Sequence, residues 1–213
     1  MKNNTLLVCV GVVAFSLTAF SAKAQNITAT LNEIDPSVSV KGTFDSGNTI
    51  GNYTSGVSQF SSSTLNDDFS AFCVEPNATI TVGQTLTYQV TNLSGLTNSD
   101  KVAKLVGGYL SSAQTSADAA AIQWAIWEVT SETSSSKNLT NGSVKIYSPN
   151  TSVSALANTY LANINNYAAA DIFYLTNSKY QNMIAWKGDA VPEPTSLSLL
   201  ALSGALLMRR KRK

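Results

Sequence analysis

Histidine is absent from all 213 residues, and charged residues are scarce, at 13% of the chain. Without histidine, neither a Ser-His-Asp nor a Cys-His catalytic site can be built, and the commonest transition-metal ligand is missing. A glycoside hydrolase needs only two carboxylates, and the acids that could supply them are Asp67, Asp68, Glu75, Glu128 and Glu132. Adjacent acids in a loop are more often solvated charge. We therefore expect a protein that is not an enzyme and uses no metal and no cofactor.

The N-terminus has the three parts of a secretory signal peptide. Lys2 supplies a basic start, residues 6–20 are apolar, and Ala22 and Ala24 form a small-x-small cleavage site. The apolar stretch is too short for an ordinary membrane span. A permanent N-terminal anchor is the alternative, but polar Gln25 follows Ala24 directly. We expect residues 1–24 to be a signal peptide that is removed on export.

The C-terminus also has three parts in a fixed order. Pro192, Glu193 and Pro194 come first, an apolar run covers residues 197–208, and basic residues fill 209–213. The positive-inside rule keeps such a basic block in the cytoplasm, and a run shorter than about 20 residues suits a transient transmembrane anchor. Residues 188–213, which comprise a linker and this tail, resemble the PEP-CTERM sorting signal. The resemblance implies recognition by exosortase, a membrane protease of Gram-negative bacteria. A simple tail-anchored helix would leave the Pro-Glu-Pro motif unexplained.

Removal of both ends changes the charge of the chain. Residues 25–190 contain seven lysines against twelve Asp and Glu, so a formal charge of +1 for the whole chain becomes −5 for the body. An acidic body has no basic stripe for a phosphate backbone, and we expect no nucleic-acid partner. The length suits one domain, which we place at residues 25–187.

Hydrophobic periodicity changes from strand to helix and back along this body. Short apolar or alternating runs predict strands between 27 and 90, among them 37–40, 69–74, 80–82 and 86–90. Helical spacing follows at 99–110, from 116 or 117 to about 129, and at 153–164, and Thr115 with Asp118 approximates a capping box. Strand character returns at 172–175 and 183–186. This order predicts an α+β fold, a β-sandwich or barrel with an inserted helical block.

Cysteine is almost absent. Cys9 falls in the signal peptide, which leaves Cys73 as the only thiol of the mature body and rules out an internal disulfide. An unpaired cysteine in an exported protein indicates an intermolecular bridge, a reactive thiol or another kind of bond. The alternative is an inert buried side chain, because Cys73 stands between Phe72 and Val74 in an apolar strand.

A helical segment fifty residues later offers Cys73 a partner. Residues 122–127 read Ile-Gln-Trp-Ala-Ile-Trp, and residues 72–74 read Phe-Cys-Val. Together the two segments resemble the paired motifs of the thioester domains of bacterial surface adhesins. The resemblance implies an internal thioester between the Cys73 thiol and the Gln123 side chain. Trp127 lies one turn beyond Gln123 on the same helix face, so Trp127 and Phe72 could shield such a bond from water.

Glu128 is the third supporting residue that we name beside Phe72 and Trp127. It follows Trp127 in sequence but lies on a different helix face, and we predict no definite role for it. The functional hypothesis is an exported adhesion module that captures an amine or a hydroxyl of a surface or an exopolysaccharide, once per molecule. The alternative is a structural protein of the extracellular matrix in which the same residues only cross-link or pack. We expect exosortase as a processing partner and a transient contact with the inner membrane.

Overall fold

The computed structural model describes residues 25–132 and 137–186. The predicted signal peptide, with Ala22 and Ala24, and the predicted sorting motif, Pro192-Glu193-Pro194, lie outside the described residues. Within the described part of the chain, no helix is both long enough and apolar enough to span a membrane.

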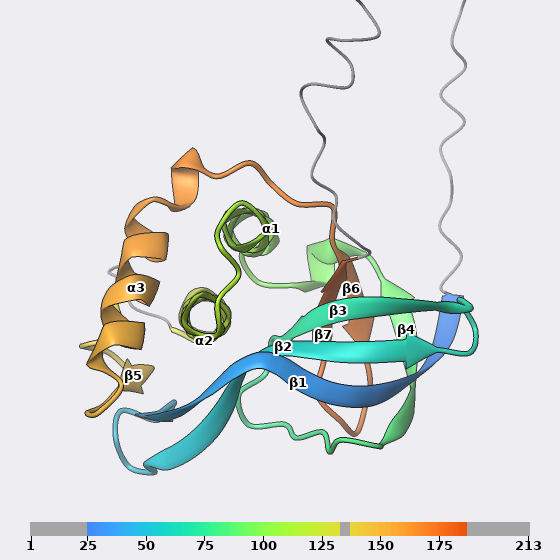
Figure 1. The fold of residues 1–213 in the computed structure, drawn as a ribbon, viewed down its shortest axis with the longest axis horizontal. Coiled ribbons are helices and arrows are strands. Elements are labelled where there is room, and N and C mark those ends of the chain that lie inside the picture. Colours follow the sequence, from blue (N-terminus) through green and yellow to red (C-terminus); the bar gives the residue numbers. More distant parts are fainter. Residues whose placement is uncertain (1–24, 133–136, 187–213) are drawn as a thin grey trace, which may run out of the picture.

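Seven antiparallel strands form one sheet that closes on itself. The strands are β1 (Gln25–Thr43), β2 (Gly51–Ser62), β3 (Asp67–Cys73), β4 (Thr85–Thr91), β5 (Lys145–Ile146), β6 (Phe173–Thr176) and β7 (Met183–Trp186). Neighbouring strands follow the order β2-β3-β7-β6-β4-β1-β5, and β2 also pairs with β1. This extra pairing joins β1, β2, β3, β7, β6 and β4 into a closed ring (Figure 1). Register shifts near Glu33 and Ser37 bend β1, which pairs with both β2 and β4.

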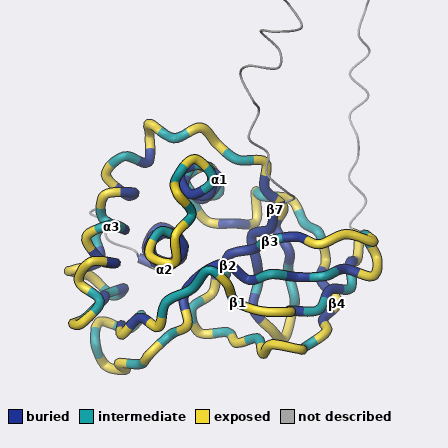
Figure 2. The backbone as a smooth tube through the Cα atoms, in the orientation of Figure 1, coloured by how far each residue is buried: buried dark blue, intermediate teal, exposed yellow. Residues whose placement is uncertain are grey.

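Side chains that alternate along the strands fill the interior of this ring. Phe60 and Phe69 stack with their ring centroids 5.1 Å apart, and Tyr88 meets Phe60 edge-on at 6.1 Å. The cluster, called the ring interior below, also contains Ile27, Ala29, Leu31, Ala71, Leu86, Leu175, Met183 and Ala185. In Figure 2, buried positions and more exposed positions follow one another along the strands.

Three helices pack beside the ring. They are α1 (Ser99–Leu110), α2 (Ser116–Ser131) and α3 (Thr151–Ala162), with short 3-10 turns η1 (Leu93–Gly95) and η2 (Ile164–Asn166). The central helix α2 contacts α1, α3 and the strands β1, β2 and β3. Every residue of α2 from Ala119 to Val129 is buried, including the polar Gln123 and Glu128, as expected for a helix in the interior of a domain. Its first turn is closed by a capping box between Thr115 and Asp118.

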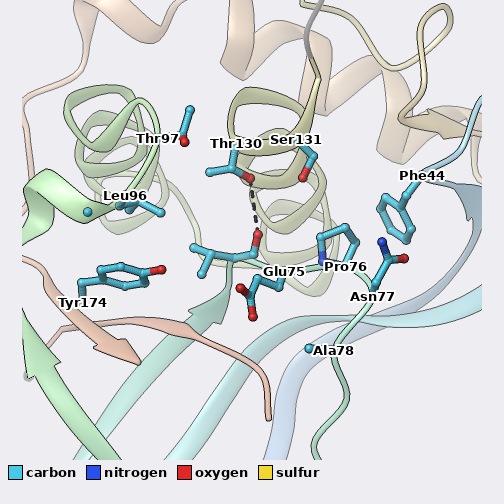
Figure 3. A pocket seen from close by; sticks show the side chains of 12 residues that line it. Phe44, Glu75, Pro76, Asn77, Ala78, Leu96, Thr97, Thr130, Ser131 and Tyr174 are labelled. Atoms are coloured by element: carbon cyan, nitrogen blue, oxygen red, sulfur yellow. Dashed lines mark hydrogen bonds between the residues drawn. The ribbon is translucent and has the colours of Figure 1, made fainter. Parts of the chain in front are cut away.

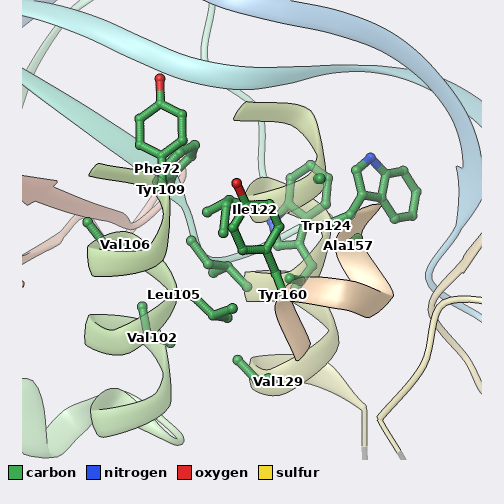
Figure 4. Packing of buried hydrophobic residues seen from close by; sticks show 14 of the residues in the cluster. Phe72, Val102, Leu105, Val106, Tyr109, Ile122, Trp124, Val129, Ala157 and Tyr160 are labelled. Atoms are coloured by element: carbon green, nitrogen blue, oxygen red, sulfur yellow. The ribbon is translucent and has the colours of Figure 1, made fainter. Parts of the chain in front are cut away.

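A second core, called the helical core below, lies between these helices and the strands (Figure 4). Trp124 is fully buried at its centre and donates from Nε1 to Ser55 Oγ at 2.9 Å. The indole stacks on Phe44 with ring centroids 4.9 Å apart. A Cβ atom at Gly42 would lie 2.0 Å from the same indole, so glycine is required where β1 passes under Trp124.

The predicted α+β fold is confirmed, with strands, a helical block and closing strands in that order. The helix predicted at 99–110 and the capping box at Thr115 are also confirmed. Two local predictions are wrong. Residues 80–82 form no strand, because the chain turns there, with Gln84 N donating to Thr81 O and Gly83 at a φ of 86°. The third helix ends at Ala162, and Ile164 begins the separate turn η2.

Candidate functional site

The structure brings Cys73 and Gln123 together across fifty residues of sequence. Cys73 is the last residue of β3, and Gln123 lies in the middle of α2 with 1% of its surface exposed. Gln123 Oε1 accepts a hydrogen bond from Cys73 N at 2.9 Å, and Gln123 Nε2 donates one to Cys73 O at 2.7 Å. The carboxamide of Gln123 is therefore fixed against the main chain of Cys73.

Gln123 fills a gap in the hydrogen bonding of β3. The β2–β3 pairing ends at Ala71, two residues before Cys73. On the other side of β3, Val74 N donates to the residue that precedes β7, at 3.1 Å. Because antiparallel pairs alternate between bonded and non-bonded positions, the N–H and C=O of Cys73 point away from β7. The Gln123 carboxamide supplies both missing bonds, so neither main-chain group is left unpaired.

The side chain of Cys73 shares a face of β3 with Phe69 and Ala71, which belong to the ring interior. At the end of its strand it also borders the helical core. Burial raises the pKa of the Cys73 thiol to about 12, although the Ser58 hydroxyl acts in the opposite direction. The thiol is therefore protonated at neutral pH, and little thiolate is present to act as a nucleophile.

Two hydroxyl groups near this thiol have no hydrogen bond of good geometry. They are Ser58 Oγ and Tyr88 Oη, on side chains that are 1% and 0% exposed. Burial raises the pKa of Tyr88, and the charge of an ionised Cys73 raises it further. An unpaired buried hydroxyl costs about 1–3 kcal/mol. No pattern in the sequence singles out Ser58, because β2 is rich in serine and lacks clear alternation.

The two aromatic residues predicted to shield the site are both buried. Phe72 contacts Tyr109 and Trp186, with ring centroids 5.2 and 5.0 Å away. Trp127 meets Phe44 edge-on at 5.0 Å. Both rings contact other aromatic residues and belong to the helical core.

Glu128 has a different environment from the one around Cys73. Its side chain is fully buried, Oε1 accepts from Asn138 N at 2.8 Å, and Oε2 has no partner. Burial raises the pKa of Glu128 to about 7, and Glu132 raises it further, whereas Asn138 and Lys137 lower it. The hydrogen bond from Asn138 joins Glu128 to the segment that follows α2. Among the described residues, Glu128 has no hydrogen bond to Cys73 or Gln123. No group of three or more acids, cysteines or histidines in this part of the chain could hold a metal ion.

A cleft of about 650 Å³ opens directly after β3 (Figure 3). Thr130 of α2 donates to Val74 O at 3.4 Å at its inner end. Its other walls are formed by Phe44, Glu75, Pro76, Asn77, Ala78, Gly95, Leu96, Thr97, Ser131 and Tyr174. The cleft thus reaches the residue next to Cys73, while Cys73 and Gln123 themselves do not line it.

Comparisons of the chain with protein-family models, with curated proteins and with solved structures found no match. The functional argument therefore depends on the residues and contacts described above.

Proposed function

We propose that this is an exported surface or matrix protein whose body resembles a thioester domain and attaches covalently to a partner through a Cys73–Gln123 thioester. The observation that carries the proposal is the pair of hydrogen bonds between the Gln123 carboxamide and the main chain of Cys73. They hold the electrophilic group of the predicted bond beside the residue that bears its nucleophile. Holding two reactants in this way gives a large effective molarity.

The chemistry needs no external reagent. Cys73 Sγ adds to Gln123 Cδ, the C–N bond breaks, and the thiol proton leaves with the amide nitrogen as ammonia. An amine of the partner then attacks the thioester carbonyl, an amide bond forms, and Cys73 is returned as a free thiol. A hydroxyl would react in the same way to form an ester. Each molecule reacts once, so the protein does not turn over substrate.

Burial supports the protection that such a bond requires. Gln123 is 1% exposed, and Phe72 and Trp127 are 0% and 4% exposed. Exclusion of water slows hydrolysis of an activated acyl group. The cleft beside Val74 offers a partner a route to the residue next to Cys73. We infer that a partner's nucleophile approaches from this side.

Export and sorting form the second half of the proposal. Cleavage after Ala24 would release the body from its signal peptide, and Pro192-Glu193-Pro194 would direct it to an exosortase-type protease. The apolar tail would hold the protein transiently in the inner membrane. The mature protein would then stay at the cell surface or enter the extracellular matrix, where exopolysaccharide offers hydroxyl groups.

A non-reactive matrix protein is the second candidate, and one observation favours it. Both polar atoms of the Gln123 side chain already satisfy main-chain groups of Cys73. Gln123 could therefore serve only to extend the hydrogen bonding of β3, with Cys73 as a half-buried thiol.

Intact mass of the mature protein separates the two candidates. A thioester makes the protein one ammonia lighter than its sequence, and methylamine adds back to it. The variant Cys73→Ser, which replaces the thiol with a hydroxyl, provides the matched control and should show the full mass and no methylamine adduct. A wild-type protein of full mass whose Cys73 is freely alkylated after unfolding contradicts the thioester.

Covalent capture is tested on a surface. Beads that carry primary amines should retain the wild type, but not Cys73→Ser, through washing in denaturant. Equal retention of the two proteins would contradict covalent attachment.

A further inference from the structure

The ring interior holds two hydroxyl groups that its packing does not use. Ser58 on β2 stands opposite Ala71 on β3, and Cys73 is the next residue on the same face of β3. Tyr88 reaches from β4 to Phe60, which is the next residue after Ser58 on the same face of β2. Ser58, Tyr88 and Cys73 therefore gather in one part of the ring interior, from three strands.

Both hydroxyls are nine-tenths or more buried and unpaired. Buried hydroxyl groups in folded proteins nearly always have a hydrogen-bond partner. Apolar residues of similar shape, alanine and phenylalanine, would fill the same positions without this penalty. Local departures from such rules occur mostly at functional sites. Cys73, which bears the thiol of the proposed thioester, packs against the same cluster of residues.

We propose that Ser58 and Tyr88 promote formation of the Cys73–Gln123 thioester, Ser58 by relaying the thiol proton and Tyr88 by donating a hydrogen bond to the sulfur. This inference rests on the proposed function and assigns the groups that carry out its first step. It gives both hydroxyls the partner that the resting structure lacks.

The relay balances protons and bonds. As Sγ bonds to Gln123 Cδ, Ser58 Oγ takes the thiol proton and passes its own hydroxyl proton to Gln123 Nε2. The Cδ–Nε2 bond then breaks, ammonia leaves, and Ser58 is again a neutral hydroxyl. Tyr88 stabilises the negative charge that develops on the sulfur while the proton is in transit.

The environment of the thiol makes such a relay useful. Burial raises the pKa of Cys73 to about 12, so a route through free thiolate would have little nucleophile at neutral pH. Proton transfer during the attack avoids that state, and positioned proton transfer contributes about a hundredfold or more to a rate.

The test follows ammonia loss by intact mass while the mature protein refolds from denaturant. We expect Ser58→Ala to slow this loss about a hundredfold and Tyr88→Phe to slow it by a smaller factor. Ser58→Thr keeps a hydroxyl on a side chain suited to a strand and should restore the rate. Ser154→Ala, which removes another buried and unpaired hydroxyl on α3, is the matched control and should react like the wild type.

The pH profile distinguishes a proton relay from a packing role. The wild-type rate should vary little between pH 6 and pH 9, because the proton moves within the protein. In Ser58→Ala the reaction needs free thiolate, so its rate should rise about tenfold for each pH unit below the thiol pKa. A variant that is only less well packed would keep the wild-type slope.

The outcomes separate this inference from the proposed function. A wild type that loses ammonia, with Ser58→Ala and Tyr88→Phe reacting at the same rate and slope, overturns the relay and leaves the thioester standing. A wild type that keeps its full mass overturns both. If Ser58→Ala fails to fold, the rates of Tyr88→Phe and Ser58→Thr decide, and the relay requires Tyr88→Phe to be slower than wild type and Ser58→Thr to match it.

Discussion

The ring interior and the helical core differ in the buried polar groups that they place near Cys73. In the helical core, Trp127 Nε1 has no partner, but Trp124 donates to Ser55, and the carboxamide of Gln123 is fully used by the main chain of Cys73. In the ring interior, Ser58 and Tyr88 leave two hydroxyls unpaired on the side of the thiol. Paired groups stabilise a fold, whereas unpaired groups beside a nucleophile cost stability and indicate chemistry. The Cys73–Gln123 contact lies at the boundary between the two.

Truncation of one large side chain in each core should have the largest effect. Trp124→Ala in the helical core and Phe60→Ala in the ring interior should each lower the free energy of unfolding by about 3–5 kcal/mol, because both side chains are at most 1% exposed. Urea unfolding followed by circular dichroism measures the change. Since β1, β2 and β3 contribute to both cores, each variant should unfold in a single transition. Two separate transitions would contradict a shared folding unit.

Removal of the Gln123 side chain should come next. In a Cys73→Ser background, where no thioester can form, Gln123→Ala leaves both main-chain groups of residue 73 without their protein partner. We expect a loss of about 2–3 kcal/mol in urea unfolding. Gln181→Ala is the comparison, because the Gln181 side chain donates a single bond to the main chain, to Glu75 O at 2.8 Å, and should cost less. Equal losses would show that Gln123 does not extend the hydrogen bonding of β3.

Serine-to-alanine substitutions at two positions of β2 compare a paired hydroxyl directly with an unpaired one. Ser55→Ala removes the partner of the Trp124 N–H and should cost about 1–2 kcal/mol. Ser58→Ala removes a hydroxyl that has no partner, so it should change stability by less than about 0.5 kcal/mol or increase it. Thermal unfolding of the two variants beside the wild type measures both effects. A larger loss for Ser58→Ala than for Ser55→Ala would contradict the difference between the paired and the unpaired serine.

Glu128 should give the smallest effect, and one that depends on pH. Its pKa is about 7 in the folded protein against a usual value of 4.5, so the folded state holds a proton that the unfolded chain releases. This contribution to stability is complete below pH 4.5 and is lost as the pH rises through 7. Glu128→Gln stays neutral and should be more stable than wild type at pH 8 by about 1 kcal/mol, after allowance for solvent screening. Unfolding at pH 4 and pH 8 checks this, and equal differences at the two pH values would contradict it.

Local patterns predicted the helices and the outer strands of the fold. The spacing of Val102, Leu105 and Val106 indicates α1, and Thr115 marks the start of α2, because these signals depend on neighbours within one or two turns. The strand predicted at 80–82 is absent, because this short apolar run leads into a turn at Gly83 instead. A barrel was one of the two arrangements expected, but the strand order and the β1–β2 pairing that closes the ring were not predicted, because pairing between distant strands leaves no local signal.

The candidate site shows the same division. The segments around Cys73 and Gln123 stand out by their motifs, so the sequence was enough to select both residues. Their contact through the main chain depends on where the β2–β3 pairing ends, which only the assembled sheet determines. Tyr88 was placed on a strand face by its alternation with Leu86, but its place in the cluster against which Cys73 packs depends on the closed ring. Ser58 carries no signal of its own.

The place of β7 in the ring has a consequence for the order of events during biosynthesis. Cys73 pairs with Met183, more than a hundred residues later in the chain. Contacts between residues so far apart form late and slowly. The strand that pairs with Cys73 is also one of the last parts of the body to be synthesised. Until β7 pairs with β3, Cys73 lacks its neighbour Met183, so the proposed thioester would form only as folding is completed.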